Sequence, residues 1–447
     1  MTMKTMGTAC SAAAIFALGF GATAALADEK DGLPEASIAT SLNGGPDASA
    51  RAALAERGIT YGINYIGETF SSSGGAKDGS TYQGRLELLV DADLEKLWGL
   101  KGLTFHANGY QLHGRGLGGH LGEPIMAISS IEADPSTYLF ELYLEQKFGE
   151  RVSIRAGQLA VDSEFFTSET GGNFINSTFG WAGIWAADVG YANAYPLATP
   201  GARVKVDLTD NLTFLAAIYN GSPTNPAGDT NENGTAFRTN DDPFLIQELQ
   251  YKYNQPAKAE GGLKDGGYKG YKDFAPAPSG ITSLPGTIKL GSWQHTEDKS
   301  FFEVYKTGLF DSNYGFYASI DQQIYALPDD PKKGINVFAR VAGTPSDRNA
   351  VDFYFDGGVV FSGFIPSRPD DSFGAGFAYA SVSDDAIKYS DDFANSKYES
   401  VVELFYKAQI VPGLTIQPDL QYMWNVGGIE KGGDDAIYGG VRVSVAY

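Results

Sequence analysis

Hydrophobic and polar residues alternate in short runs along most of the chain. The last run, YGGVRVSVAY, shows the pattern clearly, because Val441, Val443 and Val445 alternate with Arg442 and Ser444. Successive side chains of a β-strand point to opposite faces. The pattern therefore predicts strands that each have one apolar and one polar face.

The alternation predicts sixteen strands, at residues 59–71, 82–94, 102–113, 137–148, 151–160, 201–208, 211–220, 244–254, 286–295, 314–326, 334–343, 351–362, 371–383, 397–409, 413–425 and 437–447. Tight turns alternate with long connections rich in Gly, Asp, Asn and Ser, as in outer-membrane barrels with short periplasmic turns and long outside loops. The connection at 255–285 breaks this order, and we interpret it as an insertion without an assigned role. Residues 46–58 carry the start and stop signals of a short helix.

These patterns favour an all-β fold: a transmembrane, antiparallel, up-and-down β-barrel of about 16 strands with a short N-terminal periplasmic helix. A soluble β-sandwich also alternates and is the competing architecture. Aromatic residues gather at the ends of the apolar faces, as in interfacial girdles, and the polar faces mix Arg, Lys, Glu and Asp, as a wet lumen does. Both features favour the barrel.

In a barrel, Arg442 decides which face of the last strand meets lipid. An arginine against hydrocarbon costs about 2–4 kcal/mol near the bilayer midplane. We therefore expect the valines of this strand to face lipid, with Tyr447 at the periplasmic interface. Arg442 and Ser444 are expected to face water in the lumen.

The first residues have the features of a secretory signal peptide. Lys4 is the only charged residue before position 28, an apolar run follows, and Ala25-Leu26-Ala27 has the form of a cleavage site. We expect a signal peptide at 1–27, a periplasmic segment with the short helix at 28–58 and the barrel at 59–447. An uncleaved anchor helix is the alternative.

Composition narrows the class of function. Without Lys4, the 33 basic and 54 acidic residues leave a net charge of −22, which argues against nucleic-acid binding. The lone cysteine, Cys10, lies in the expected signal peptide, so no disulfide is expected. The four histidines lack metal-site spacing, and GRGLGG at 114–119 is followed by Pro124 rather than by a helix. We find no convincing catalytic set and expect no cofactor.

The connection at 161–200 is too long for a simple hairpin turn and mixes polar with aromatic side chains. Asn173, Asn176 and Trp181 are of types that bind sugars, because amides satisfy hydroxyl groups and aromatic rings stack on C–H faces. We expect this loop to fold into the barrel and narrow it. The alternative is that its aromatic side chains only pack the loop against the wall.

Several segments resemble the carbohydrate-selective porin family, the OprB type. They include RAGQLAVDSEFF, NFINSTFGW, AYPLATPGARVKV and YESVVELFYKAQIVPGLTIQPDLQY, and the resemblance extends over nearly all of the chain after residue 27. It implies a sixteen-stranded outer-membrane barrel that passes monosaccharides such as glucose by facilitated diffusion. It also implies a constriction lined by arginine and acidic side chains beside an inward-folded loop. From the matching segments, the resemblance implies that the charged residues of this constriction include Arg155, Glu164, Arg115, Glu132 and Arg85.

The expected partners are monosaccharides, outer-membrane lipid and lipopolysaccharide, and not nucleic acid. We further expect loop 161–200 to meet Arg155 and Arg115 at the narrowest point. A general or ion-selective porin of the same fold is an alternative, and an outer-membrane enzyme or adhesin is another. The sequence leaves open whether the protein is a monomer or a homo-oligomer.

Overall fold

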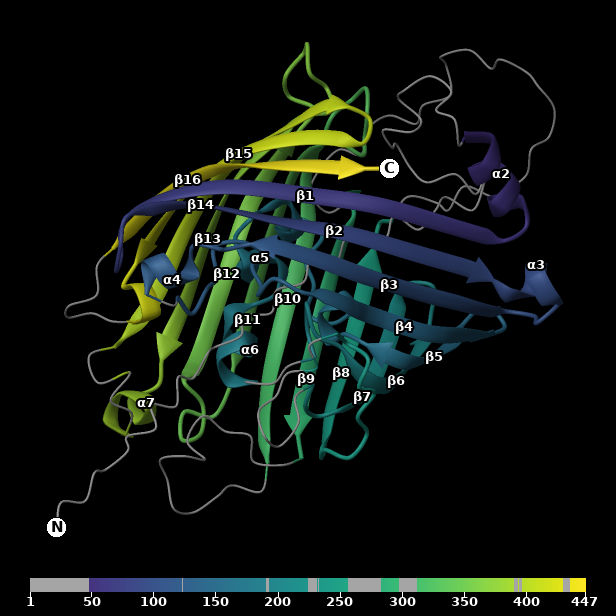
Figure 1. Ribbon diagram of the computed structural model, residues 1–447, viewed down its shortest axis with the longest axis horizontal. Helices are drawn as coiled ribbons and strands as arrows, with labels where there is room; N and C mark the ends of the chain where they lie inside the picture. The colour runs from purple at the N-terminus through teal and green to yellow at the C-terminus, as the bar shows by residue number, and fades with distance from the viewer. Residues whose placement is uncertain are drawn as a thin grey trace.

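The computed structural model is a closed barrel of sixteen antiparallel strands, in which β1 pairs with both β2 and β16 (Figure 1). The structure describes residues 48–122, 124–189, 193–223, 231, 233–255, 283–296, 312–389, 393, 396–428 and 435–447. The strands are β1 Ile59–Gly74, β2 Gly79–Asp93, β3 Leu103–Gly114, β4 Thr137–Phe148, β5 Val152–Leu159, β6 Thr199–Asp207, β7 Leu212–Asn220, β8 Pro243–Tyr253, β9 Gly286–His295, β10 Asn313–Ala326, β11 Gly334–Gly343, β12 Val351–Ser362, β13 Ser372–Val382, β14 Tyr398–Val411, β15 Leu414–Trp424 and β16 Ala436–Ala446.

These strands confirm the fold predicted from the alternation. All sixteen predicted strands are present, and their ends lie within three residues of the predicted positions. The predicted and observed ends differ most where β1 ends and β2 begins, and there the pairing of the two strands continues as far as Ser72 with Gly79. There the residues are serine and glycine rather than alternating apolar residues, so the pattern gives no signal.

The helices are short and lie at the ends of the barrel or inside it. Those in the described ranges are α2 Ala48–Glu56, α3 Leu94–Trp98, α4 Gly118–Leu121, α5 Ser177–Gly180, α6 Gly183–Asp188 and α7 Asp384–Tyr389, with 3₁₀ turns η1 Val161–Ser163, η2 Gly171–Asn173 and η6 Val426–Gly428. Figure 1 shows α2 and α3 at one end of the barrel, with the C-terminus, and α4 and α7 at the other. The tight connections, such as the one from β4 to β5, lie at the end with α2 and α3, which we call the short-turn end.

The last strand has the predicted register. Val441 is exposed on the outside of the barrel (41%), whereas Arg442 on the next position is buried (5%). Arg442 pairs with Glu68 of β1 and donates to Ser130 Oγ (2.8 Å). Its side chain thus points inward as predicted, but loop residues cover it, so it does not face open water.

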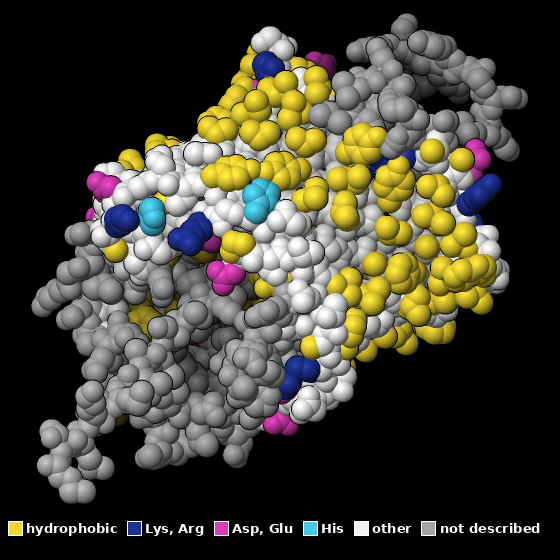
Figure 2. Space-filling model, viewed as in Figure 1, with side chains coloured by type: hydrophobic (Ala, Val, Ile, Leu, Met, Phe, Trp, Pro, Cys, Tyr) yellow, Lys and Arg dark blue, Asp and Glu magenta, His cyan; other side chains and the backbone are white. Residues whose placement is uncertain are grey.

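Hydrophobic side chains cover much of the outer face (Figure 2). Leu88, Leu144, Phe148, Ile154 and Leu290 are each more than 40% exposed there. In an aqueous setting so much exposed apolar surface would be costly. The outer face therefore suits contact with lipid.

The long loop after β5 folds into the barrel and packs on the inner wall. Its Phe166 ring lies 4.2 Å from that of Tyr317, and its Phe174 ring lies 4.9 Å from that of Phe405. Where the Phe174 ring approaches, the wall contains glycine. A Cβ at Gly376 would lie 2.8 Å from Phe174, so a larger residue there would push the loop away.

Some predictions concern residues outside the described ranges. The signal peptide at 1–27, most of the segment at 28–58 and nearly all of the insertion at 255–285 are among them. The part of the 46–58 helix that the structure describes forms α2, and Gly58 (φ +92°) follows its end. Within the described ranges, no helix combines the length and the apolar character needed to cross a membrane.

Candidate functional site

Four charged side chains form a compact group on the inner wall, which we call the charge quartet: Glu145 of β4, Arg155 of β5, Arg203 of β6 and Glu164 of the inward loop. Arg155 Nη2 lies 3.0 Å from Glu145 Oε2, and its Nη1 lies 3.5 Å from Glu164 Oε2. Arg203 Nε donates to Glu164 Oε2 (2.8 Å), and its Nη2 donates to Glu145 Oε1 (3.1 Å). Each arginine therefore bridges both carboxylates.

Strand register brings the quartet together. Glu145 pairs with Arg155 across β4 and β5, and Arg155 pairs with Arg203 across β5 and β6. Directly opposed residues lie on the same face of a sheet, so all three side chains point into the barrel. Glu164 then reaches them from the loop, one residue after η1.

The quartet is partly open to the lumen. The side chains of Arg155, Glu145 and Glu164 keep 15%, 16% and 19% of their surface exposed, whereas that of Arg203 keeps 1%. The guanidinium of Arg155 also lies over the ring of Tyr143, 4.1 Å from its centre. The group therefore offers guanidinium donors and carboxylate acceptors side by side, with no net charge.

Arg340 of β11 fixes the loop that carries Glu164. Its Nη1 donates to the carbonyls of Phe166 (3.1 Å) and Gly180 (3.0 Å), and its Nη2 donates to that of Thr178 (2.6 Å). Its charge is paired with Asp356 of β12, and both side chains are completely buried. One buried ion pair thus holds three points of the loop.

Wall carboxylates provide further anchors. Glu248 of β8 accepts the Phe166 N–H (2.8 Å), and Glu403 of β14 accepts the N–H groups of Ile175 (2.5 Å) and Asn176 (2.7 Å). Hydrogen bonds from N–H groups to carboxylates are among the strong ones. The loop is therefore held against β8 to β14 while its first residues approach β5 and β6.

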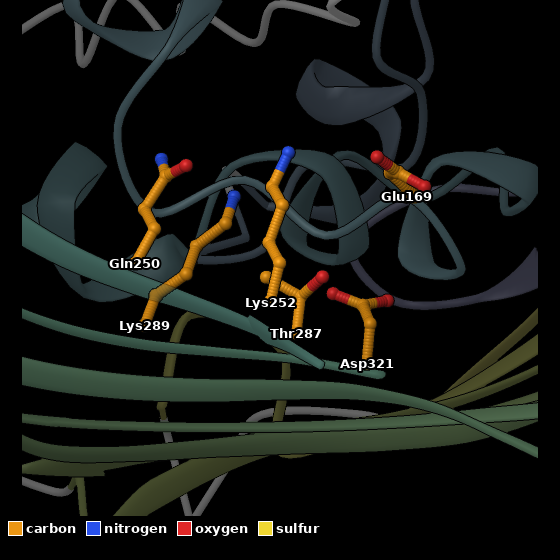
Figure 3. Close-up of a pocket in the computed structure, with 6 residues that line it drawn as sticks. All are labelled: Glu169, Gln250, Lys252, Thr287, Lys289 and Asp321. Atoms are coloured by element: carbon orange, nitrogen blue, oxygen red, sulfur yellow. The ribbon is translucent and has the colours of Figure 1, made fainter. Parts of the chain in front are cut away.

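A small polar pocket lies further round the wall from the quartet. It is lined by Glu169 of the loop, Gln250 and Lys252 of β8, Thr287 and Lys289 of β9, and Asp321 of β10. Figure 3 shows the two lysine side chains rising on one side and the two carboxylates on the other. Lys252 and Thr287 lie next to the short-turn ends of their strands.

The structure separates the five charged residues expected at the constriction. It brings Arg155 and Glu164 together, but Arg115 is exposed just beyond the loop end of β3. The quartet lies near the other end of β3, because its member Glu145 pairs with Thr104 there. The strand from residue 104 to residue 115 spans roughly 35 Å, at about 3.3 Å per residue. The expectation that Arg115 meets Arg155 is wrong, because the two lie near opposite ends of the barrel.

Glu132 and Arg85 lie away from the quartet. Glu132 is in the connection between β3 and β4, where its Oε1 accepts the Gly118 N–H (2.7 Å), and burial raises its pKa to about 7. Arg85 is buried (2%) between the rings of Tyr110 and Tyr195, at 4.8 and 5.3 Å. In this arrangement a permeating solute does not reach Arg85.

The three loop residues singled out for sugar contact have different surroundings. Asn173 is partly exposed, and its Nδ2 donates to the Thr170 carbonyl (3.1 Å). Asn176 is completely buried and donates to Gln421 Oε1 (3.0 Å), and Trp181 is 1% exposed. Asn176 and Trp181 therefore do not line an open passage, and packing against the wall is their role.

Glu145 and Arg203 were missed by the sequence reasoning. The tight turn between β4 and β5 carries a usable signal for Glu145, because a hairpin register follows from its turn. Arg203 had a weaker signal, its place on the polar face of ARVKV. That Arg203 lies next to Arg155 could not be deduced from the sequence, because the whole inward loop separates β5 from β6 and so no short turn sets their register.

Comparison with known proteins agrees with this geometry. The family model described as "Carbohydrate-selective porin, OprB family" matches residues 77–447. The chain belongs to this family. Porin B of Pseudomonas aeruginosa is 25% identical over 435 residues, covering 89% of each chain. The putative porin QuiX of Acinetobacter baylyi is 21% identical over 331 residues, covering 69% of each.

Among solved structures, the high-pH structure of Pseudomonas putida OprB superposes with a TM-score of 0.75 at 21% identity, covering 90% of this chain and 97% of that one. This likeness supports the barrel architecture. Membership of the OprB family makes the chain a porin and not an enzyme, and both findings fit a protein of the bacterial outer membrane. Within the described ranges, no cluster of three or more His, Cys, Asp or Glu residues is arranged to hold a metal ion.

Proposed function

We propose that this OprB-family porin passes neutral monosaccharides such as glucose across the outer membrane by passive diffusion, and that the charge quartet is its filter. Export with cleavage after Ala27, and contact with outer-membrane lipid and lipopolysaccharide, are parts of the same proposal. The observation that supports it most is the interlocked pairing of Arg155 and Arg203 with Glu145 and Glu164 beside an inward loop.

The chemistry of the quartet suits neutral hydroxyl groups. A hydroxyl donates one hydrogen bond and accepts others, a guanidinium only donates and an ionised carboxylate only accepts. A sugar that leaves water can exchange its water bonds for bonds to Arg155 and Glu164. Because two cations face two anions, the group has no net charge and gives an ion of either sign little advantage.

Binding must also be weak for flux to continue, because a tightly held solute blocks the pore. The quartet meets this requirement, since its members already satisfy one another. Arg155 makes ion pairs to both Glu145 and Glu164 before any solute arrives. A hydroxyl then competes with existing bonds instead of filling vacant ones. No cofactor and no covalent step enter this mechanism.

Liposome swelling with a panel of solutes tests the proposal against a general porin. We expect glucose to enter faster than uncharged solutes of similar size that lack its hydroxyl groups, and Arg155→Ala to remove this advantage. A general or ion-selective porin predicts rates set by size or charge alone. Equal ranking of all solutes in wild type and Arg155→Ala would exclude the quartet as a sugar filter.

A further inference from the structure

The polar pocket on β8 to β10 has free hydrogen-bonding capacity, in contrast to the quartet. Among the described residues, neither the Lys252 ammonium nor the Glu169 carboxylate takes part in a hydrogen bond or an ion pair, and both side chains are exposed. Lys252 therefore offers three donors and Glu169 two acceptor oxygens. They face each other across the same small hollow (Figure 3).

Hydrogen bonds connect the rest of the pocket to the inward loop. Lys289 Nζ donates to the carbonyl (2.7 Å) and the hydroxyl (2.8 Å) of Thr167, and Asp321 Oδ1 accepts from Ser168 Oγ (2.7 Å) and the Thr170 N–H (3.0 Å). These bonds tie the loop to β9 and β10. Counting only bonds among the described residues, one N–H of Lys289 and the second oxygen of Asp321 remain for a solute.

The charges of the pocket identify the class of solute. Two lysines balance two carboxylates, so an anion or a cation meets as much repulsion as attraction. A small neutral molecule with several hydroxyl groups can use the donors and the acceptors together. Gln250 and Thr287 add groups that can both donate and accept.

We infer that this pocket is a second monosaccharide subsite, on the inner wall at the short-turn ends of β8 and β9. The inference rests on the proposed function, because it assigns the sugar a second contact on the same passage. Lys252 and Glu169 are exposed, so a sugar exchanges their bonds to water for its own and is held only weakly here as well. A solute that leaves one weak site can then bind at the other without being trapped. The loop residues between Glu164 and Thr170 connect the two sites.

Single-channel recording of the full protein in planar bilayers tests the inference, with glucose on both sides and the sugar-induced current noise giving the affinity. Lys252→Gln and Glu169→Gln should each weaken glucose binding by about three- to tenfold, because each replaces a charge-assisted hydrogen bond to the sugar with a weaker neutral one. Lys252→Arg keeps the donors and should restore most of the affinity. Lys332→Gln and Glu150→Gln are matched controls in exposed short turns and should leave it unchanged.

The outcomes separate this inference from the proposed function. If Arg155→Ala weakens glucose binding but Lys252→Gln and Glu169→Gln do not, the second subsite is excluded and the quartet stands. If the two pocket variants change ion preference without changing glucose affinity, the pocket is only an electrostatic lining and the inference is wrong. If glucose does not affect the wild-type current at all, both proposals fall.

Discussion

Replacing Glu164 with Gln changes the charge of the quartet while keeping its shape. The amide oxygen of glutamine can still accept from Arg203 Nε, which lies 2.8 Å from the carboxylate in wild type. The two arginines then face only Glu145, and the group gains a net charge of +1. Arg155→Ala has the opposite effect, because it leaves Glu145 and Glu164 with one arginine.

The size of the effect follows from Coulomb's law. A monovalent ion passing about 6 Å from the new charge interacts with it by about 0.7 kcal/mol in water, and a Debye length of about 10 Å at 0.1 M salt reduces this to about 0.4 kcal/mol. The anion gains this amount and the cation loses it. The ratio of anion to cation permeability should therefore rise by about 0.8 kcal/mol, or roughly fourfold.

The reversal potential in a KCl gradient measures this ratio directly. We expect Glu164→Gln to shift it toward anions and Arg155→Ala to shift it toward cations, with Glu150→Gln in an exposed turn as the control. A larger shift at 0.05 M than at 1 M salt would confirm the electrostatic origin. Shifts of the same sign in both variants, or none in either, would refute the proposal that the quartet is the filter.

Three further predictions concern the loops and the register. Arg340→Met should lower the free energy of unfolding by about 3–5 kcal/mol, since it leaves Asp356 buried without its partner. Adding Asp356→Asn should recover part of this loss. Urea denaturation in detergent measures the free energy of unfolding of both variants. In a protein without Cys10, Ser444→Cys should react with a small water-soluble thiol reagent because its side chain faces the lumen, whereas Val443→Cys should not because its side chain faces lipid. Equal reactivity of the two variants would contradict the register of the last strand. Burial raises the pKa of Glu132 to about 7 in the folded state, so the folded state binds the proton more tightly and loses stability as pH rises from about 4.5 to about 7. Protease protection of the β3–β4 connection should therefore decrease over this range in wild type and stay constant in Glu132→Gln, and parallel profiles would contradict this.

The strands were predictable because each carries its own signal. Alternation divides the residues of each strand into two faces. The cost of placing a charge against hydrocarbon then decides which of the two faces meets lipid, as for Arg442. The pairing of Glu145 with Arg155 could also have been deduced, because a tight turn joins their strands.

The contacts of the inward loop were not predictable in this way. Trp181 is of a type that stacks on sugars, but whether it faces the lumen or the wall depends on strands far away in the sequence. Glycines on those strands, such as Gly376, make room for loop rings, and a glycine in a strand gives no sign of which ring will occupy the space. The prediction that Arg115 meets Arg155 was wrong for a related reason. Matching segments do not show how far along the barrel axis a residue lies.

The most direct test of the sugar-filter proposal is the single-channel current of wild type and Arg155→Ala at increasing glucose concentration. The proposal predicts a saturable, concentration-dependent reduction of the wild-type current, with an affinity that is several-fold weaker in Arg155→Ala and unchanged in Glu150→Gln. A wild-type current that does not respond to glucose or to any other monosaccharide, or a response identical in Arg155→Ala, would contradict the proposal that the quartet recognises sugars.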